Sequence, residues 1–160
     1  MGKTQAEVAV LGSGSWATAL VKLLSPNAEK IAWYIREKAI IDHIATYNHN
    51  PRYLSTVELD KSKLLMTNDI NKAAGMADIL IFVIPSAYLK KSLAGLRTDI
   101  SGKMVCSAIK GIVPEDNYIV GDYFHKKLDV PLKNMVILTG PTHSEEIAME
   151  KLTYLTVASP

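Results

Sequence analysis

The sequence predicts an α/β domain with a doubly wound, mostly parallel sheet and helices on both of its faces. Apolar segments of strand length recur along the chain, and helix-compatible segments bounded by Gly, Pro, Asn or Asp lie between them. A glycine-rich turn joins the first strand to the first helix. The chain has 160 residues, 48% hydrophobic and 21% charged, which is enough for one domain with a core. We therefore expect one α/β domain over residues 1–160.

The expected elements alternate along the whole chain. The strands are expected at 8–11, 31–35, 79–84, 104–109, 135–139 and 154–158. The helices are expected at 15–24, 37–47, 70–75, 86–96, 115–127 and 144–151. The longest apolar run, 79–85, is too short to cross a bilayer and suits a strand buried on both faces. Residues 48–69 are polar and contain Pro51, so we expect a loop there with a short strand at 64–66.

The turn after the first strand has the spacing of a dinucleotide-binding turn. Gly12 suits the tight turn, Gly14 allows the backbone to approach a pyrophosphate, and Ala17 allows close packing of helix on strand. The following helix directs its free N–H groups at an anion in the turn, and Ser15 adds a hydroxyl donor. These features favour a Rossmann-like, dinucleotide-binding domain. The alternative is a tight strand-to-helix turn without a nucleotide.

The end of the second strand bears on cofactor preference. Arg36 stands where domains that prefer NAD usually carry an acid for the ribose hydroxyls, and an arginine there can contact the 2′-phosphate of NADP. This residue favours acceptance of NADP. Glu37 is adjacent, however, and a strand end shifted by one residue would make it the acid of an NAD site.

The next two strand ends also reach the expected crevice. Pro85 either shapes the wall beside the nicotinamide or simply begins the next helix. Lys110 follows a buried strand and would hold a positive charge over the crevice, the alternative being a solvent-facing lysine at a turn. Residues 139–146 form a second strand-to-helix turn able to hold an anion. We do not expect His143 to act as acid or base, because no carboxylate partner is identifiable.

Composition argues against several other functions. Cys106 is the only cysteine and lies in an apolar segment, which excludes an internal disulfide or a thiolate cluster and predicts a buried strand residue. The histidines lack metal-ligand spacing, so no metal site is expected. A net charge of +2 with dispersed lysines does not indicate nucleic acid as a partner. Without a signal-like N-terminus or a membrane segment, the expected location is the cytoplasm.

Together these motifs resemble one enzyme family. In order, the chain carries G-S-G-S-W-A-T-A-L, N-x-x-x-Y-L from Asn48 or Asn50 to Leu54, V-I-P-S, I-K-G-I and G-P-T-H-S-E-E-I. This series is similar to that of the NAD(P)-dependent glycerol-3-phosphate dehydrogenase family and extends over essentially the whole chain. The sequence departs from the family pattern at Ala17, where glycine is usual, at Ser55, where proline is typical, and at 142–144, where the family has Ser-Phe-Ala.

The resemblance implies roles for particular residues. It places Ser15, Trp16 and Arg36 on the dinucleotide, with Ser144 near it. It also implies that Lys110, Gly140 and Thr142 border the crevice where NAD or NADP meets a small phosphorylated substrate. No catalytic residue is expected within this chain, and Lys110 would only support the reaction with its charge.

The resemblance further implies a second, helical domain that carries the catalytic lysine, whereas this chain ends at Pro160. We therefore expect the chain to bind cofactor and to catalyse little or nothing, whether it is an excised segment or a natural truncation. A homodimer of the full-length protein is a further possibility. The alternatives are another dehydrogenase of the superfamily, such as a ketopantoate or hydroxyacid reductase, and a non-catalytic NAD(P)-sensing module.

Overall fold

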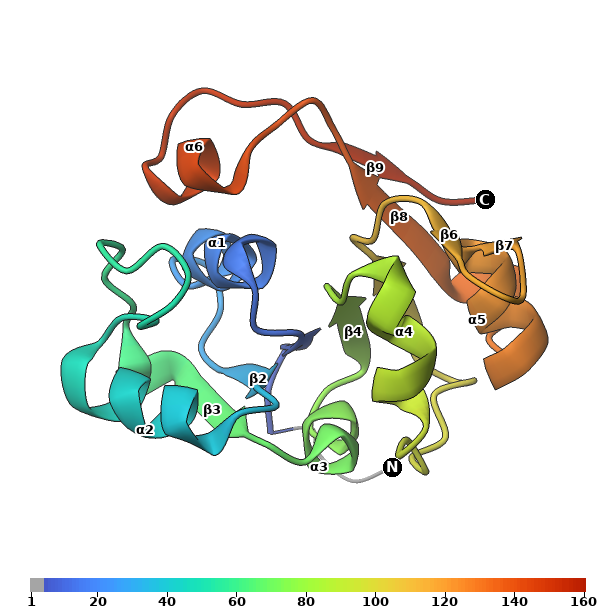
Figure 1. The fold of residues 1–160 in the computed structure, drawn as a ribbon, viewed down its shortest axis with the longest axis horizontal. Coiled ribbons are helices and arrows are strands. Elements are labelled where there is room, and N and C mark those ends of the chain that lie inside the picture. Colours follow the sequence, from blue (N-terminus) through green and yellow to red (C-terminus); the bar gives the residue numbers. More distant parts are fainter. Residues whose placement is uncertain (1–4) are drawn as a thin grey trace.

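A computed structural model describes residues 5–160, and its centre is one twisted sheet (Figure 1). The strand order is β3-β2-β1-β4-β5-β8-β9. The strands are β1 Val8–Leu11, β2 Ile31–Tyr34, β3 Leu64–Thr67, β4 Ile79–Phe82, β5 Met104–Ser107, β8 Met135–Thr139 and β9 Thr156–Ala158. The first six run parallel, and β9 pairs antiparallel with β8 at one edge. The predicted fold class is confirmed.

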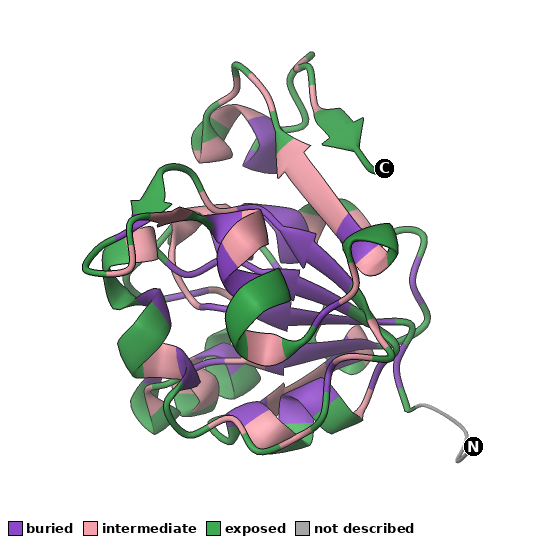
Figure 2. Ribbon diagram, turned by 90° about the vertical axis from the view of Figure 1, so that its right-hand side faces the viewer, coloured by how far each residue is buried: buried purple, intermediate pink, exposed green. Residues whose placement is uncertain are grey.

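Helices cover both faces of this sheet because each central strand is apolar on both sides. The helices are α1 Ser15–Leu24, α2 Lys38–Tyr47, α3 Ile70–Gly75, α4 Ser86–Leu93, α5 Val120–Leu128 and α6 Ser144–Ala148. Ala9 and Leu11 of β1 pack in one cluster with α3, α4 and α5, whereas Val8 and Val10 pack in another with α1, α2 and α6. Figure 2 shows the buried strands between helices whose outer faces are exposed.

Several predicted elements have the bounds that the sequence indicated. Strands 8–11 and 135–139 and helices 15–24 and 70–75 match the structure residue for residue. The strands predicted to reach 35, 84 and 109 end one or two residues earlier, although single backbone hydrogen bonds continue each ladder, such as Val83 N to Leu11 O at 2.9 Å. The short strand expected at 64–66 is β3. The last strand begins at Thr156 rather than Tyr154.

The helix predicted at 115–127 was wrong at its start. A hairpin of β6 Ile112–Val113 and β7 Tyr118–Ile119 occupies this region, and α5 begins only at Val120. Glu115 and Asn117 have φ of 68° and 54°, a left-handed conformation that no helix contains. The helices predicted to end at 96 and 151 stop at Leu93 and Ala148, and α2 begins at Lys38 because Glu37 is its N-cap.

Three described features bear on the sequence-based exclusions. Cys106 is a buried residue of β5, as expected, and burial raises the pKa of its thiol to about 11. Among residues 5–160, no three His, Cys, Asp or Glu side chains gather where they could hold a metal ion. No helix in that range combines the length and the apolar character needed to cross a membrane.

The packing of α5 on the sheet generates a stability prediction. Phe124 is fully buried, and its ring centroid lies 4.6 Å from that of Phe82 in β4. Phe124→Ala should lower the free energy of unfolding by about 3–5 kcal/mol, because it removes buried apolar area and leaves a cavity. Urea denaturation followed by circular dichroism would measure this loss. Leu23→Ala, at a side chain 43% exposed, is the control and should change it little; equal effects of the two variants would contradict the packing.

Candidate functional site

The turn between β1 and α1 lies where the sheet changes its winding direction. β1 pairs with β2 on one side and with β4 on the other. The strands that follow β1 are therefore added first on one side of it and then, from β4 on, on the other side. Gly12 has a φ of 143°, and a Cβ at this position would collide with the main-chain carbonyl of Val83. Only glycine fits there. The close approach of Gly12 to Val83 holds the residue that follows β1 against the residue that follows β4.

Gly14 differs from Gly12, because the space beside its Cα is open. It is the N-cap of α1, and a Cβ built on it would have no atom within 4 Å. Among residues 5–160, no side chain caps this helix end, and the first turn of α1 carries no acid. The unpaired N–H groups and the positive end of the helix dipole therefore face open space, which suits an anion. Ala17 is fully buried in the core beneath, as its packing role predicted.

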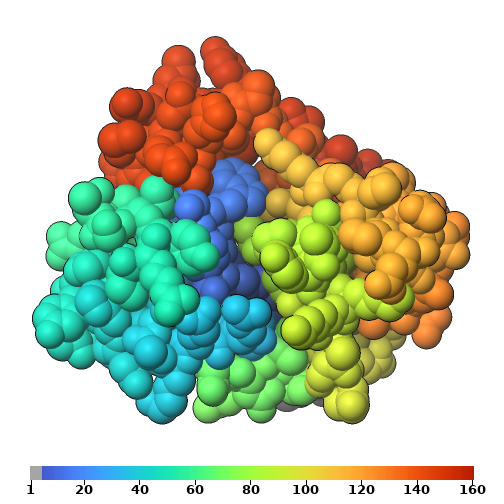
Figure 3. Space-filling view, viewed as in Figure 1, coloured from blue at the N-terminus to red at the C-terminus, as the bar shows by residue number. Residues whose placement is uncertain are grey.

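A hollow of about 370 Å³ opens from this turn across the ends of β2 and β4. It is lined by Gly12, Ser13, Gly14, Tyr34, Arg36, Glu37, Tyr53, Val83, Ile84, Pro85, Tyr88 and Ser92. Figure 3 shows it between the blue and cyan surface of the first segments and the yellow-green surface of α4. Burial raises the pKa of Tyr34 above its ordinary value, while the charge of Arg36 acts in the opposite direction. Pro85 both lines this hollow and is the N-cap of α4.

A second hollow of about 280 Å³ lies at the ends of β5 and β8. Its lining residues are Trp16, Ala108, Lys110, Leu138, Thr139, Gly140, Thr142, His143, Ser144 and Glu145. The predicted site residues thus divide between two neighbouring hollows. Gly12, Gly14 and Arg36 line the first, and the second contains Trp16, Lys110, Gly140, Thr142 and Ser144. Ser15 and Ala17 line neither hollow.

The wall of the second hollow is a turn held by the chain that returns after α6. Gly140 has a φ of 150°, and a Cβ there would collide with the carbonyl of Tyr154. The Thr153 hydroxyl donates a hydrogen bond to the Thr142 hydroxyl. His143 is the N-cap of α6, and its backbone N–H donates to the Glu146 carboxylate at 3.4 Å. This position gives His143 a structural role at a helix end.

Asn50 contacts the glycine turn, although in the sequence it stood out only as part of the N-x-x-x-Y-L motif. Its side chain is fully buried, and its amide donates to the Ser13 carbonyl at 3.2 Å and to the Thr18 hydroxyl at 3.0 Å. Its Oδ1 accepts from the backbone N–H groups of Arg52 and Tyr53 at 3.0 and 3.2 Å. Asn50 therefore joins the loop after α2 to the glycine turn. The available signal was an Asn-Pro pair, which is typical of a turn.

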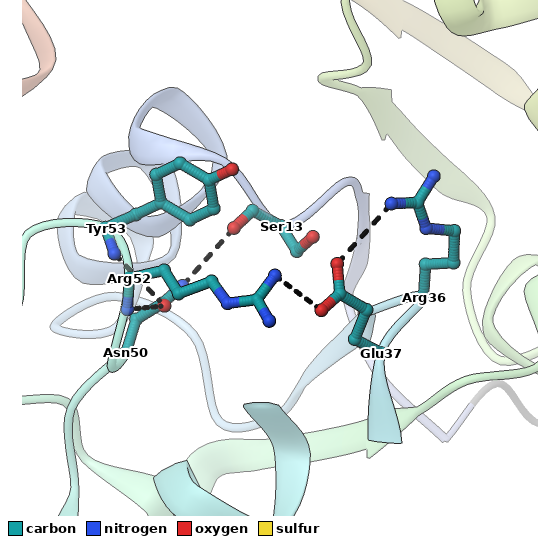
Figure 4. Close-up of polar contacts among 6 residues, drawn as sticks. All are labelled: Ser13, Arg36, Glu37, Asn50, Arg52 and Tyr53. Atoms are coloured by element: carbon teal, nitrogen blue, oxygen red, sulfur yellow. Dashed lines mark hydrogen bonds and ion pairs between the residues drawn. The ribbon is translucent and has the colours of Figure 1, made fainter. Parts of the chain in front are cut away.

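Three charged side chains, those of Arg36, Glu37 and Arg52, meet beside the first hollow, which Arg36 and Glu37 line (Figure 4). Glu37 Oε1 lies 3.4 Å from Arg36 Nη2, and Glu37 Oε2 lies 2.6 Å from Arg52 Nη1. The side chains of Arg36 and Arg52 are 70% and 59% exposed, and that of Glu37 is 34% exposed. The sequence left Arg36 and Glu37 as alternatives at the ribose, whereas both line the hollow in the structure.

Comparison with known proteins adds an independent finding. Residues 7–160 match the family model described as NAD-dependent glycerol-3-phosphate dehydrogenase N-terminus. Glycerol-3-phosphate dehydrogenase [NAD(P)+] of Nitratidesulfovibrio vulgaris (strain DP4) is 34% identical over 142 residues, 88% of this chain and 43% of that protein. The enzyme of the same name from an Exiguobacterium species is 31% identical, over 96% of this chain and 45% of that protein. This chain thus spans less than half of these relatives.

Solved structures agree with this match. Glycerol-3-phosphate dehydrogenase of Plasmodium falciparum superposes with a TM-score of 0.84 at 25% identity, over 98% of this chain and 46% of that chain. The Coxiella burnetii enzyme superposes with a TM-score of 0.82 at 22% identity, over 97% of this chain and 47% of that chain, a likeness that shows the fold alone.

The two glycines of the turn should respond differently to the same substitution. Gly12→Ala should lower the free energy of unfolding by about 3 kcal/mol or more, because it combines a collision with the Val83 carbonyl and an unfavourable φ. Gly14→Ala should change it by about 1 kcal/mol or less, since its φ of −77° suits alanine and its Cβ has room. Thermal and urea unfolding would measure both. A tolerant Gly12 would contradict the described contact between the exits of β1 and β4.

Loss of the Asn50 side chain should also destabilise the protein. Asn50→Ala should lower the free energy of unfolding by about 1–3 kcal/mol, because buried partners around the glycine turn would lose their hydrogen bonds. The exposed Asn27 supplies a matched control, and Asn27→Ala should have almost no effect. Urea titrations of the two variants would decide. Equal stability of both would mean that the loop does not depend on Asn50.

Proposed function

The chain belongs to the NAD-dependent glycerol-3-phosphate dehydrogenase family, as its motifs predicted, and we propose that it is the dinucleotide-binding domain of such an enzyme. In this proposal residues 1–160 bind NAD or NADP, and a substrate-binding helical domain belongs to the rest of the protein. The parent enzyme would interconvert glycerol 3-phosphate and dihydroxyacetone phosphate. This chain matches only 43% and 45% of the length of two relatives, which supports the proposal that the parent enzyme has a second domain.

One observation supports nucleotide binding most directly. The helix end at Gly14 has no side-chain cap from the described part of the chain, and it adjoins a hollow of about 370 Å³ where the strand order of the sheet reverses. The pyrophosphate would accept hydrogen bonds from backbone N–H groups of residues 14–17, with the Ser15 hydroxyl as a further donor. The adenosine half would occupy the first hollow, with Arg36 beside the ribose. The nicotinamide half would extend towards the second hollow.

A nicotinamide cofactor, when bound, would supply the hydride-transfer chemistry, and the chain's own residues would bind and orient the reactants. Lys110 lines the second hollow with Gly140 and Thr142. Its ammonium group would attract the substrate phosphate and would stabilise negative charge developing on the ketone oxygen during reduction. Trp16 and Ser144, which line the same hollow, would contact the cofactor. We propose that the proton donor lies outside residues 1–160, so this chain alone should turn over little substrate.

Two broader proposals concern the whole protein. A single, buried free thiol at Cys106 suits a reducing compartment, which supports a cytoplasmic location. The homodimer expected for the full-length protein stays a prediction. Another reductase of the superfamily and an NAD(P)-sensing module were the alternatives, and the match of residues 7–160 to one family argues against both.

Calorimetric titration with NADH and NADPH tests the proposal. Both should bind the wild-type chain, and Arg36→Ala should weaken NADPH by about 10- to 100-fold, the worth of a charge-assisted hydrogen bond. NADH should change by about 3-fold or less, because it lacks the 2′-phosphate. Arg97→Ala, which changes an exposed arginine in the loop before β5, is the control. Failure of the wild-type chain to bind either nucleotide would refute the proposed function.

A further inference from the structure

Glu37 lies between two arginines, one its neighbour in the sequence and one from the following loop. Arg36 precedes it directly, whereas Arg52 reaches it from the loop between α2 and β3 (Figure 4). The chain contains only three arginines, and two of them meet on this one carboxylate at the rim of the first hollow.

We infer that Arg52 is a second arm for the 2′-phosphate of NADP, and that Glu37 is an internal anion which holds the two guanidinium groups when no 2′-phosphate is present. The inference rests on the proposed dinucleotide binding and deepens it. The same three side chains would then accept both cofactors, with Glu37 serving the ribose hydroxyls of NAD and the arginines serving NADP.

The exposure of the two arginine side chains makes such an exchange feasible. Ion pairs between exposed groups are screened by water and contribute little to stability. The side chains of Arg36 and Arg52 are more than half exposed, so replacing Glu37 by another anion should cost little. A phosphate monoester carries up to two negative charges and three acceptor oxygens. It can therefore form more charge-assisted hydrogen bonds with two planar guanidinium groups than one carboxylate can.

The backbone of Arg52 is held in a fixed position relative to the glycine turn. The Arg52 N–H donates to Asn50 Oδ1 at 3.0 Å, and the amide of Asn50 donates to the Ser13 carbonyl at 3.2 Å. The backbone of Arg52 is thus fixed next to the site proposed for the pyrophosphate. Its exposed side chain can still exchange Glu37 for a phosphate. This anchoring distinguishes Arg52 from an arginine on an unattached surface loop.

Glu37 should act in the opposite sense to Arg52. A carboxylate only accepts hydrogen bonds, so it suits the 2′- and 3′-hydroxyls of the NAD ribose and repels a phosphate at the same place. As the N-cap residue of the ten-residue helix α2, it also lies where the helix dipole favours a negative charge. The position of Glu37 therefore sets how strongly the site discriminates between the two cofactors.

Calorimetric titration of the 160-residue chain with NADPH, NADH, adenosine 2′,5′-bisphosphate and 5′-AMP tests the inference. Arg52→Gln should weaken NADPH and the bisphosphate by about tenfold or more, and should leave NADH and 5′-AMP within about twofold. Arg52→Lys should restore part of the lost affinity because it restores the charge. Glu37→Gln should strengthen NADPH several-fold and should not strengthen NADH. Raising the salt concentration should weaken NADPH less in Arg52→Gln than in the wild type.

Matched controls separate a charge effect at the site from a general one. Arg97→Gln and Glu29→Gln change exposed charges in the loops before β5 and β2, and both should leave all four affinities unchanged. Equal weakening of NADPH and NADH by Arg52→Gln would overturn the inference and would assign Arg52 to the support of its loop. Glu37→Gln without an effect on NADPH would overturn the role of Glu37. Absence of dinucleotide binding by the wild-type chain would instead refute the proposed function itself.

Discussion

The contact between Gly12 and the carbonyl of Val83 is the constraint on which the crevice depends. At this point the chain leaves β1, and the exits of three strands converge on a single residue. Gly12 N–H donates to the Tyr34 carbonyl at 3.2 Å, and the Gly12 carbonyl accepts from the buried Trp33 Nε1 at 2.7 Å. Both polar groups of Gly12 are therefore used within the protein, and no side chain fits. Gly12 therefore has no backbone group left for a ligand, whereas Gly14, two residues later, borders open space.

The buried Asn50 carries this rigidity into the loop that would border the ribose. An asparagine with no exposed surface is stable only when its amide is satisfied, and here both ends of the amide have partners. The Thr18 hydroxyl extends the connection, because it accepts from Asn50 and donates to the Gly14 carbonyl at 3.0 Å. The loop and the start of α1 therefore form one hydrogen-bonded unit. A change at Asn50 should be felt at the anion-binding end of the helix as well as in the loop.

The sequence predicts the conformation of a residue well when local patterns determine it, and poorly when contacts with other segments determine it. Helix 15–24 and strand 8–11 were predictable because apolar periodicity and glycine sterics are local and strong. Segment 115–127 was wrongly predicted as helix throughout, because Glu115 and Asn117 adopt left-handed conformations in the turn between β6 and β7, where the Asn117 N–H donates to the Val113 carbonyl at 3.0 Å. The glycine turn was visible in the sequence for the same steric reason that makes it rigid. The meeting of Arg52 with Glu37 was not, since it depends on where a polar loop folds back.

The two hollows differ in what forms their walls, and this difference bears on how binding and catalysis divide. The first hollow is bordered by the ends of β1, β2 and β4, and these strands pack against apolar clusters on both faces of the sheet. The second depends on a turn held by residues 153–155, and in this segment Tyr154 and the preceding Leu152 are 70% and 87% exposed. Exposed apolar side chains gathered at one end are typical of a surface that another segment covers. Under the proposed function, nucleotide binding would therefore be a property of this domain, whereas substrate turnover would require the remainder of the protein to complete the second hollow.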